Sequence, residues 1–307
     1  MKKIFLSIGL LGLGLALSAC NLPFNNELNN NAESSIETSV EEVSNTENDE
    51  TPEEPVKEEP VVNEVVPEPE STKVGNFVIS GDRLTVTGGT YEQDGNPDNG
   101  KEAIVWKVLA DDEDTMLLIS DKILDMIPFN SSFSGTDWDN SYIRKWLNED
   151  FFENSFDDEQ KSIILEYATT KGVEAVPADP EADPPVEAVE AVLEVTDKVF
   201  LLSYEELSLY YPENINTDSE KRSSQVTEYA KENGVWTVSE EGYVLYGFEK
   251  DGLSKDIIGG GNWWLRDNGA KPTQAMDVGA SGIVRTTGHD VGSIHDGIRP
   301  VILIKTR

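Results

Sequence analysis

Two short stretches of the chain combine aromatic and charged side chains that could contact a ligand. Trp138 and Asp139 form the first stretch, and Trp264, Arg266 and Asp267 belong to the second. An exposed indole can stack on the apolar face of a sugar ring, while guanidinium and carboxylate groups hydrogen-bond to hydroxyl or peptide groups. These five residues are therefore the candidate ligand-binding residues, and the ligand could be a glycan, a peptide or a protein.

The same residues have a structural alternative. Both indoles could pack in the core, and Arg266 could form a partly buried ion pair or lie over an aromatic ring. Packing is the more common role for large aromatic side chains in a folded domain, so the structural alternative is favoured. Arg144 and Arg299 are expected to share that role.

Both histidines of the chain, His289 and His295, lie six residues apart in a glycine-rich segment, and each precedes an aspartate. Two imidazoles with Asp290 and Asp296 could hold a transition metal, or one His-Asp pair could act as a general base. The spacing matches no established motif. Exposed loop residues are the favoured interpretation, and an extracellular metal-assisted enzyme is the alternative.

A second candidate ion site lies at residues 94–100, where Asp94, Asn96 and Asp98 offer oxygen ligands at alternate positions, as a calcium loop would. The pattern fails as an EF-hand because Asn99 replaces the required glycine and Val105 replaces the bidentate glutamate. Asp, Asn and Gly are ordinary turn residues, so a turn is favoured and no cofactor is expected.

The candidate residues near the C-terminus lie on two expected strands, at 262–267 and 296–304. Both segments are short and rich in apolar residues, and glycines flank or interrupt them. Because successive side chains of a strand point to opposite faces, Trp263 and Leu265 share one face, while Trp264 and Arg266 share the other. One face must be core, and the other is covered by loops or open to a ligand.

The order of the expected strands and helices predicts an α+β fold, mainly a twisted antiparallel sheet with flanking short helices. Several strands precede any helix, which argues against a repeated strand-helix-strand unit. Ser141 and the capping boxes Asp157/Gln160 and Ser203/Glu206 predict helix starts. The expected strands are 77–79, 83–87, 103–109, 115–120, 198–202, 236–238, 243–248 and 281–286, and a helix is expected at 227–232.

The N-terminus predicts export and lipid attachment. Two lysines precede an apolar run at 4–17 that is shorter than the roughly 20 residues of a membrane span. The run ends in Leu-Ser-Ala-Cys at residues 17–20, which resembles the lipobox of bacterial lipoproteins. The resemblance implies a signal peptide at 1–19, a lipid on Cys20, and a membrane-anchored protein on the extracytoplasmic face.

Composition divides the rest of the chain. Residues 20–73 are acidic and proline-rich, which predicts a disordered tether. Residues 74–307 are expected to form one domain, interrupted at 173–195 by an acidic low-complexity insertion whose ends lie close together. The chain carries 24 Lys and Arg against 59 Asp and Glu, a formal net charge of −35, which argues against a nucleic-acid partner.

An ordered set of short motifs resembles a bacterial family of domains of unknown function found in secreted and lipid-anchored proteins. The set comprises Trp-Lys-Val-Leu at 106–109, the segment 138–148, residues 199–203, Trp-Trp-Leu-Arg at 263–266, and Gly-Ile-Arg-Pro at 297–300, where the family usually has Gly-Val-Arg-Pro. The paired tryptophans and the closing glycine-arginine strand also resemble the C-type-lectin-like fold, including its formylglycine-generating-enzyme branch. That resemblance implies an irregular ligand face.

These observations favour a lipid-anchored cell-surface protein that presents a non-catalytic, lectin-like binding domain on an acidic tether. The alternatives are an extracellular metal-assisted enzyme using His289 and His295, and a purely structural module of the cell envelope. The solvent exposure of Trp264 distinguishes these hypotheses, because an exposed Trp264 favours the binding domain and a buried one favours the structural module.

Overall fold

The computed structural model describes residues 69–170, 172, 176–178, 181, 185, 193–214 and 216–307. The predicted signal peptide, Cys20 and nearly all of the predicted tether lie outside the described residues, as does most of the predicted insertion. Within the described part of the chain, no helix is both long and apolar enough to cross a lipid bilayer.

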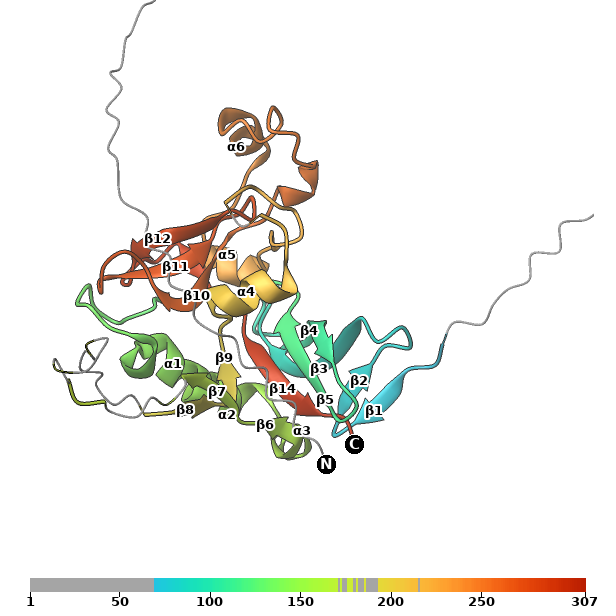
Figure 1. Cartoon of the computed structure of the whole chain (residues 1–307). Coiled ribbons are helices and arrows are strands. Elements are labelled where there is room, and N and C mark those ends of the chain that lie inside the picture. Colours follow the sequence, from blue (N-terminus) through green and yellow to red (C-terminus); the bar gives the residue numbers. More distant parts are fainter. Residues whose placement is uncertain are drawn as a thin grey trace, which may run out of the picture. The chain divides into compact units, whose positions relative to one another are not determined.

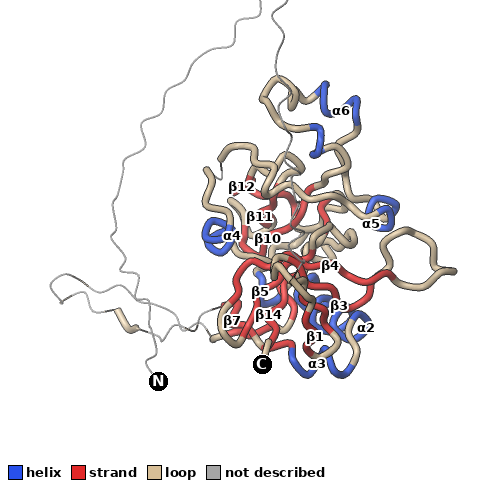
Figure 2. The backbone as a smooth tube through the Cα atoms, turned by 90° about the vertical axis from the view of Figure 1, so that its right-hand side faces the viewer, coloured by secondary structure: helices blue, strands red, loops and turns tan. Residues whose placement is uncertain are grey.

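The larger sheet has eight strands, all paired antiparallel, and curls into a half-barrel (Figures 1 and 2). Five consecutive strands form a meander that includes the expected strands at 77–79, 103–109 and 115–120. The last strand of the chain then pairs with β5 on one side and with two short strands on the other. The strands are β1 (Thr72–Val74), β2 (Phe77–Ile79), β3 (Thr85–Tyr91), β4 (Glu102–Asp111), β5 (Thr115–Ser120), β14 (Val301–Lys305), β6 (Ile164–Leu165) and β9 (Val199–Phe200).

A smaller sheet of four strands holds the Trp-Trp segment. Its order is β12 (Val284–Asp290), β11 (Gln274–Val278), β10 (Asn262–Asn268) and β13 (Asp296–Gly297), and β13 runs parallel to β10. The strand expected at 296–304 is thus two strands in different sheets. Pro300 explains the break, because it has no N–H group to donate to a continuous ladder.

A two-stranded sheet closes the predicted insertion. β7 (Tyr167–Thr170) pairs with β8 (Val195–Asp197), and Thr170 lies opposite Val195. The pairing brings the two ends of the insertion together, as expected.

Local capping explains most of the helix starts. Ser141 caps the first α-helix, Asp157 and Ser203 form the two predicted capping boxes, and Thr227 caps a helix that covers the predicted segment. The helices are α1 (Tyr142–Trp146), α2 (Phe152–Ser155), α3 (Asp158–Ile163), α4 (Tyr204–Tyr210), α5 (Glu228–Glu232) and α6 (Glu240–Leu245), with 3₁₀ turns η1 (Trp138–Asn140) and η3 (Lys255–Ile257) and a π turn η2 (Leu147–Phe151) that joins α1 to α2.

The prediction of a strand at 243–248 is wrong. Residues 243–245 belong to α6, where the Ser239 hydroxyl accepts a hydrogen bond from the Gly242 N–H group and two glutamates occupy the first turn. Both features favour a helix N-terminus over a strand. Helix α6 lies away from the larger sheet in both views (Figures 1 and 2).

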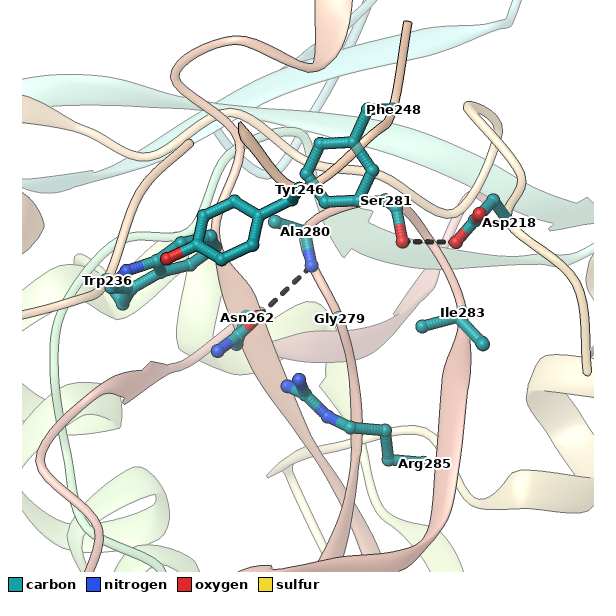
Figure 3. A pocket seen from close by; sticks show the side chains of 10 residues that line it. All are labelled: Asp218, Trp236, Tyr246, Phe248, Asn262, Gly279, Ala280, Ser281, Ile283 and Arg285. Atoms are coloured by element: carbon teal, nitrogen blue, oxygen red, sulfur yellow. Dashed lines mark hydrogen bonds between the residues drawn. The ribbon is translucent and has the colours of Figure 1, made fainter. Parts of the chain in front are cut away.

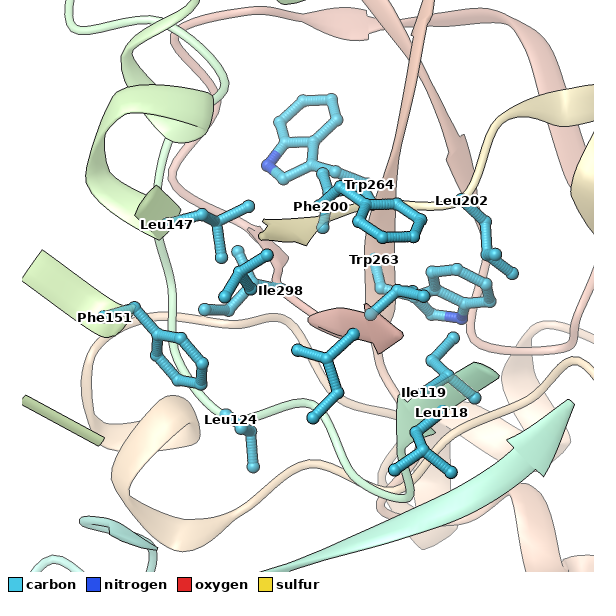
Figure 4. Close-up of a cluster of buried hydrophobic side chains, with 14 of the residues drawn as sticks. Leu118, Ile119, Leu124, Leu147, Phe151, Phe200, Leu202, Trp263, Trp264 and Ile298 are labelled. Atoms are coloured by element: carbon cyan, nitrogen blue, oxygen red, sulfur yellow. The ribbon is translucent and has the colours of Figure 1, made fainter. Parts of the chain in front are cut away.

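The core encloses β10 on both faces. Trp263 and Trp264 have no exposed surface, and Leu265 between them and Arg266 is equally buried. Figure 4 shows the two indoles on opposite sides of the strand, among side chains of the larger sheet such as Leu118 and Phe200. The observed sheets and short helices confirm the α+β class.

Replacing Trp264 with Ala is expected to lower the free energy of unfolding by about 3–5 kcal/mol, because the change leaves a cavity in a closed core. Leu84→Ala is the control, since Leu84 is 66% exposed and its loss should cost less than about 0.5 kcal/mol. Urea denaturation of both variants measures the difference. A cost below about 1 kcal/mol for Trp264→Ala would contradict the buried position.

Candidate functional site

The structure places Trp264 in the core rather than on a ligand face. Its Nε1 donates a hydrogen bond to the Ile127 carbonyl at 3.1 Å, and its ring lies 5.9 Å from the ring of Phe129 in an edge-on arrangement. An indole without exposed surface cannot stack on a sugar. The predicted platform therefore does not include Trp264.

Trp138 and Arg266 meet at Thr169 of β7. The Nε1 of Trp138 donates to the Thr169 hydroxyl at 3.2 Å and to Asp197 Oδ2 at 3.0 Å, while the Nε of Arg266 donates to the Thr169 carbonyl at 3.2 Å. The carboxylate of Asp139 accepts a hydrogen bond from the neighbouring Thr170 hydroxyl at 2.7 Å. The sequence-predicted residues therefore do lie in one region, but internal contacts occupy them.

Arg266 has the structural role that the sequence favoured. It forms a bidentate ion pair with Glu206 and donates to the Leu201 carbonyl at 2.8 Å, and its guanidinium lies 5.9 Å from the ring of Phe200. Asp267 Oδ2 accepts from the Tyr204 N–H group at 2.7 Å at the start of α4. Arg266, Glu206 and Asp267 line a cavity of about 520 Å³, yet their charged groups are already engaged.

Burial and ion pairing shift the pKa values of the carboxyl groups in this region in opposite directions. Burial raises the pKa of the Asp267 carboxyl. Burial also opposes ionisation of Glu206, but the hydrogen bonds and positive charge of Arg266, with hydrogen bonds from Ser203 and Tyr167, outweigh it and hold the pKa of Glu206 below its ordinary value. A carboxyl with a lowered folded-state pKa stabilises the protein above its unfolded-state pKa and loses that contribution as the pH falls.

Glu206→Gln is expected to lower the free energy of unfolding by about 3 kcal/mol at pH 7, because Arg266 stays buried without its counter-charge. The difference from the unchanged protein should be smaller at pH 3 than at pH 7, because it is lost as the pH falls through the lowered folded-state pKa of Glu206. Glu149→Gln, which removes an exposed pair with Lys145, should cost less than about 1 kcal/mol at either pH. An equal loss at pH 7 and pH 3, measured by urea denaturation, would contradict the assignment.

A different pocket combines accessible aromatic rings with polar groups. Trp236, Tyr246 and Phe248 form its aromatic wall, and it encloses about 470 Å³. The Tyr246 ring lies 5.6 Å from the Trp236 ring and 6.0 Å from the Phe248 ring. Tyr246 is 55% exposed, so this aromatic surface can contact a ligand. We call this site the aromatic pocket.

Polar side chains line the rest of the aromatic pocket (Figure 3). Asn262 Oδ1 accepts a hydrogen bond from the Ala280 N–H group at 3.1 Å, which orients the side-chain amide at the start of β10. The Ser281 hydroxyl donates to Asp218. Arg285 of β12 extends toward Asn262 and Gly279 in Figure 3. The site can thus stack on one face of a ligand and hydrogen-bond to its polar groups.

A buried charge network holds Arg285 in place. Arg285 Nε donates to Asp277 Oδ2 at 2.8 Å, and neither Asp277 nor Asp296 has exposed surface. His289 Nδ1 lies 2.9 Å from Asp296 Oδ1, and the Ser293 hydroxyl donates to Asp296 Oδ2 at 2.6 Å. Burial raises the pKa of Asp277 to about 6, and the hydrogen bond to Asp296 raises the pKa of His289.

The network corrects the predicted pairing of the two histidines. His289 lies with Asp277 and Asp296, whereas His295 is not a member of that group. His295 is exposed, and its Nδ1 lies 3.5 Å from the Gly234 carbonyl. The favoured interpretation of exposed loop residues therefore applies to His295. It does not apply to His289, which is half-buried, and Asp290 is exposed but is the last residue of β12.

The candidate calcium loop has the geometry of a turn. Asp94 Oδ1 accepts from the Asn96 N–H group at 2.8 Å, and its Oδ2 accepts from Asn99 at 2.7 Å. Asp94 also approaches Glu92 and Glu102, an acidic group at the surface. Both carboxylate oxygens of Asp94 therefore accept hydrogen bonds within the turn.

A family model described as a domain of unknown function (DUF6273) matches residues 113–306. The chain belongs to this family. The DUF6273 match confirms the predicted membership of a family of unknown function, and it begins after the motif at 106–109. No curated protein and no solved structure matches the chain.

The DUF6273 region contains the whole aromatic pocket, yet sequence reasoning missed its walls. Trp236 and the segment 243–248 were predicted as strands, which hid the exposure of Tyr246 and Phe248. The available signal in the sequence was the group of Tyr243, Tyr246 and Phe248 between Gly242 and Gly252. Whether they face solvent depends on how α6 and its neighbouring loops pack.

Proposed function

We propose that this protein is a lipid-anchored cell-surface protein whose DUF6273 domain is a non-catalytic binding domain, with a neutral glycan held in the aromatic pocket. The supporting observation is the set of three accessible rings, Trp236, Tyr246 and Phe248, beside polar groups in a pocket of about 470 Å³. Ligand sites commonly have this composition, a largely apolar lining with a few polar groups that fix orientation.

The shape and chemistry of the pocket favour a sugar ring. Tyr246 and Trp236 offer ring faces and edges for the apolar face of a pyranose, while Asn262, Asp218 and Arg285 offer hydrogen-bonding groups for its hydroxyls. Asp277 offsets the charge of Arg285, and the chain as a whole is strongly acidic. Both features favour a neutral ligand over an anionic one.

We also propose that the DUF6273 domain has a C-type-lectin-like fold. The antiparallel sheets, the short helices and the long loops around the aromatic pocket are compatible with it. The resemblance is one of fold, so the assignment of a ligand depends on the site itself.

Replacing Tyr246 or Trp236 with Ala is expected to weaken glycan binding by about 2 kcal/mol, roughly 30-fold, because each change removes a stacking surface. A glycan array probed with the full chain identifies a ligand, and titration calorimetry measures its affinity. Tyr142→Ala is the matched control, since Tyr142 is an exposed aromatic residue that does not line the pocket.

Two outcomes would overturn the binding proposal. One is ligand binding that Tyr246→Ala and Tyr142→Ala leave equally unchanged. The other is the absence of binding to glycans and cell-wall fragments by a folded chain, which would favour the structural envelope module instead. The burial of Trp264 and Arg266 is the observation that supports that second candidate.

The anchoring part of the proposal depends on Cys20, the only cysteine. Cys20→Ser is expected to abolish incorporation of a labelled fatty acid and to move the protein out of the membrane fraction, because the thiol is the site of acylation. Expression in a bacterium with a lipoprotein-processing pathway, followed by fractionation, measures both effects. Unchanged labelling in Cys20→Ser would show that the lipobox assignment is incorrect.

A further inference from the structure

Three strands of the smaller sheet bring together two carboxylates and one imidazole. Asp277 lies on β11, His289 on β12 and Asp296 on β13, and one ligand atom from each lies within 4.8 Å of the other two. The sheet register fixes these positions, because Asp277 pairs with Trp264 of β10 and Asp296 pairs with Asn262. The cluster is therefore built on paired strands.

His289 Nδ1 lies 2.9 Å and 3.0 Å from the two oxygens of Asp296, and each carboxylate also accepts a hydrogen bond from a residue outside the cluster. Ser293 donates to Asp296 Oδ2, and Arg285 donates to Asp277 Oδ2. Asp277 Oδ1 is buried and has no hydrogen-bond partner among the described residues. A buried unpaired carboxylate oxygen is costly, so this atom calls for a partner that the described protein groups do not supply.

We propose that Asp277, His289 and Asp296 bind a divalent first-row transition-metal ion. One imidazole with two carboxylates suits such an ion, and three protein ligands leave a coordination position open. His289 is half-buried, which leaves a path from solvent. Arg285 and Ser293 each donate to one oxygen of a carboxylate, and donors of this kind orient the ligands in established metal sites.

The net charge of Asp277, Asp296 and Arg285 shows how a metal site differs from a network of protein ion pairs alone. Two buried carboxylates face one guanidinium, so one negative charge is left to balance. A bound metal ion would supply the positive charge, or His289 would supply it as an imidazolium. The two cases differ in whether the chain binds added metal.

Titration of the metal-free full chain with ZnCl₂ tests the proposal, with CaCl₂ as the comparison ion. We expect Zn²⁺ to bind with one ion at this site and Ca²⁺ to bind it much more weakly, because calcium prefers all-oxygen ligand sets. Tyr246→Ala should retain the Zn²⁺ site, because the metal proposal does not depend on ligand binding in the aromatic pocket.

His289→Ala should weaken Zn²⁺ binding at least about tenfold, and Ser293→Ala should weaken it about tenfold through loss of support for Asp296. His295→Ala is the matched control, because it removes the other imidazole of the same segment and should leave the affinity unchanged. Circular dichroism confirms that each variant is folded. Asp277→Asn is less suitable alone, since Asp277 is a buried partner of Arg285.

Two results would overturn the metal site. Failure of the folded chain to bind Zn²⁺ would mean that Arg285 and a protonated His289 balance the carboxylates. Zn²⁺ binding that His289→Ala leaves unchanged would place the ion elsewhere, for example at the surface group of Glu92, Asp94 and Glu102.

Discussion

The structure depends on hydrogen bonds from buried tryptophan and arginine side chains to backbone carbonyls of loops and of a strand end. A buried carbonyl outside regular secondary structure needs a donor, or it costs free energy. Trp263 donates to the Arg222 carbonyl, Trp264 to that of Ile127, and Arg299 to that of Ser120. The side chains of β10 and of the segment between β13 and β14 thus combine apolar burial with donors that hold neighbouring segments onto the core.

These contacts connect the core to the aromatic pocket. The guanidinium of Arg299 lies 4.8 Å from the Trp263 ring, Trp263 donates to the Arg222 carbonyl, and Arg222 donates to the Gly282 carbonyl at 2.7 Å. Gly282 has a φ of +82°, and an added Cβ would lie 1.9 Å from the Ser219 carbonyl oxygen, so the turn requires glycine. Ser281, the preceding residue, lines the pocket. The loop at the pocket is therefore positioned by the buried tryptophan.

Sequence reasoning succeeded where a structure is specified locally. The capping boxes at Asp157 and Ser203 place both partners three residues apart, so the helix starts could be predicted from the sequence alone. It failed at α6, where apolar residues suggested a strand although Ser239 and two glutamates encode a helix start. The candidate site was harder, because Asp277, His289 and Asp296 come from three strands whose register depends on the whole sheet.

The need for these carbonyl contacts also explains why the Trp-Trp-Leu-Arg segment does not expose its side chains to solvent. A strand buried on both faces uses its aromatic and cationic groups for packing and for carbonyl contacts, so exposing one of them would disrupt several loops at once. The outer strand β12 has no such constraint. Arg285 lines the aromatic pocket and also binds Asp277, so a change of charge within the Asp277, His289 and Asp296 cluster would act directly on a residue of the pocket. The aromatic pocket and the charge state of the cluster are thus linked through one side chain.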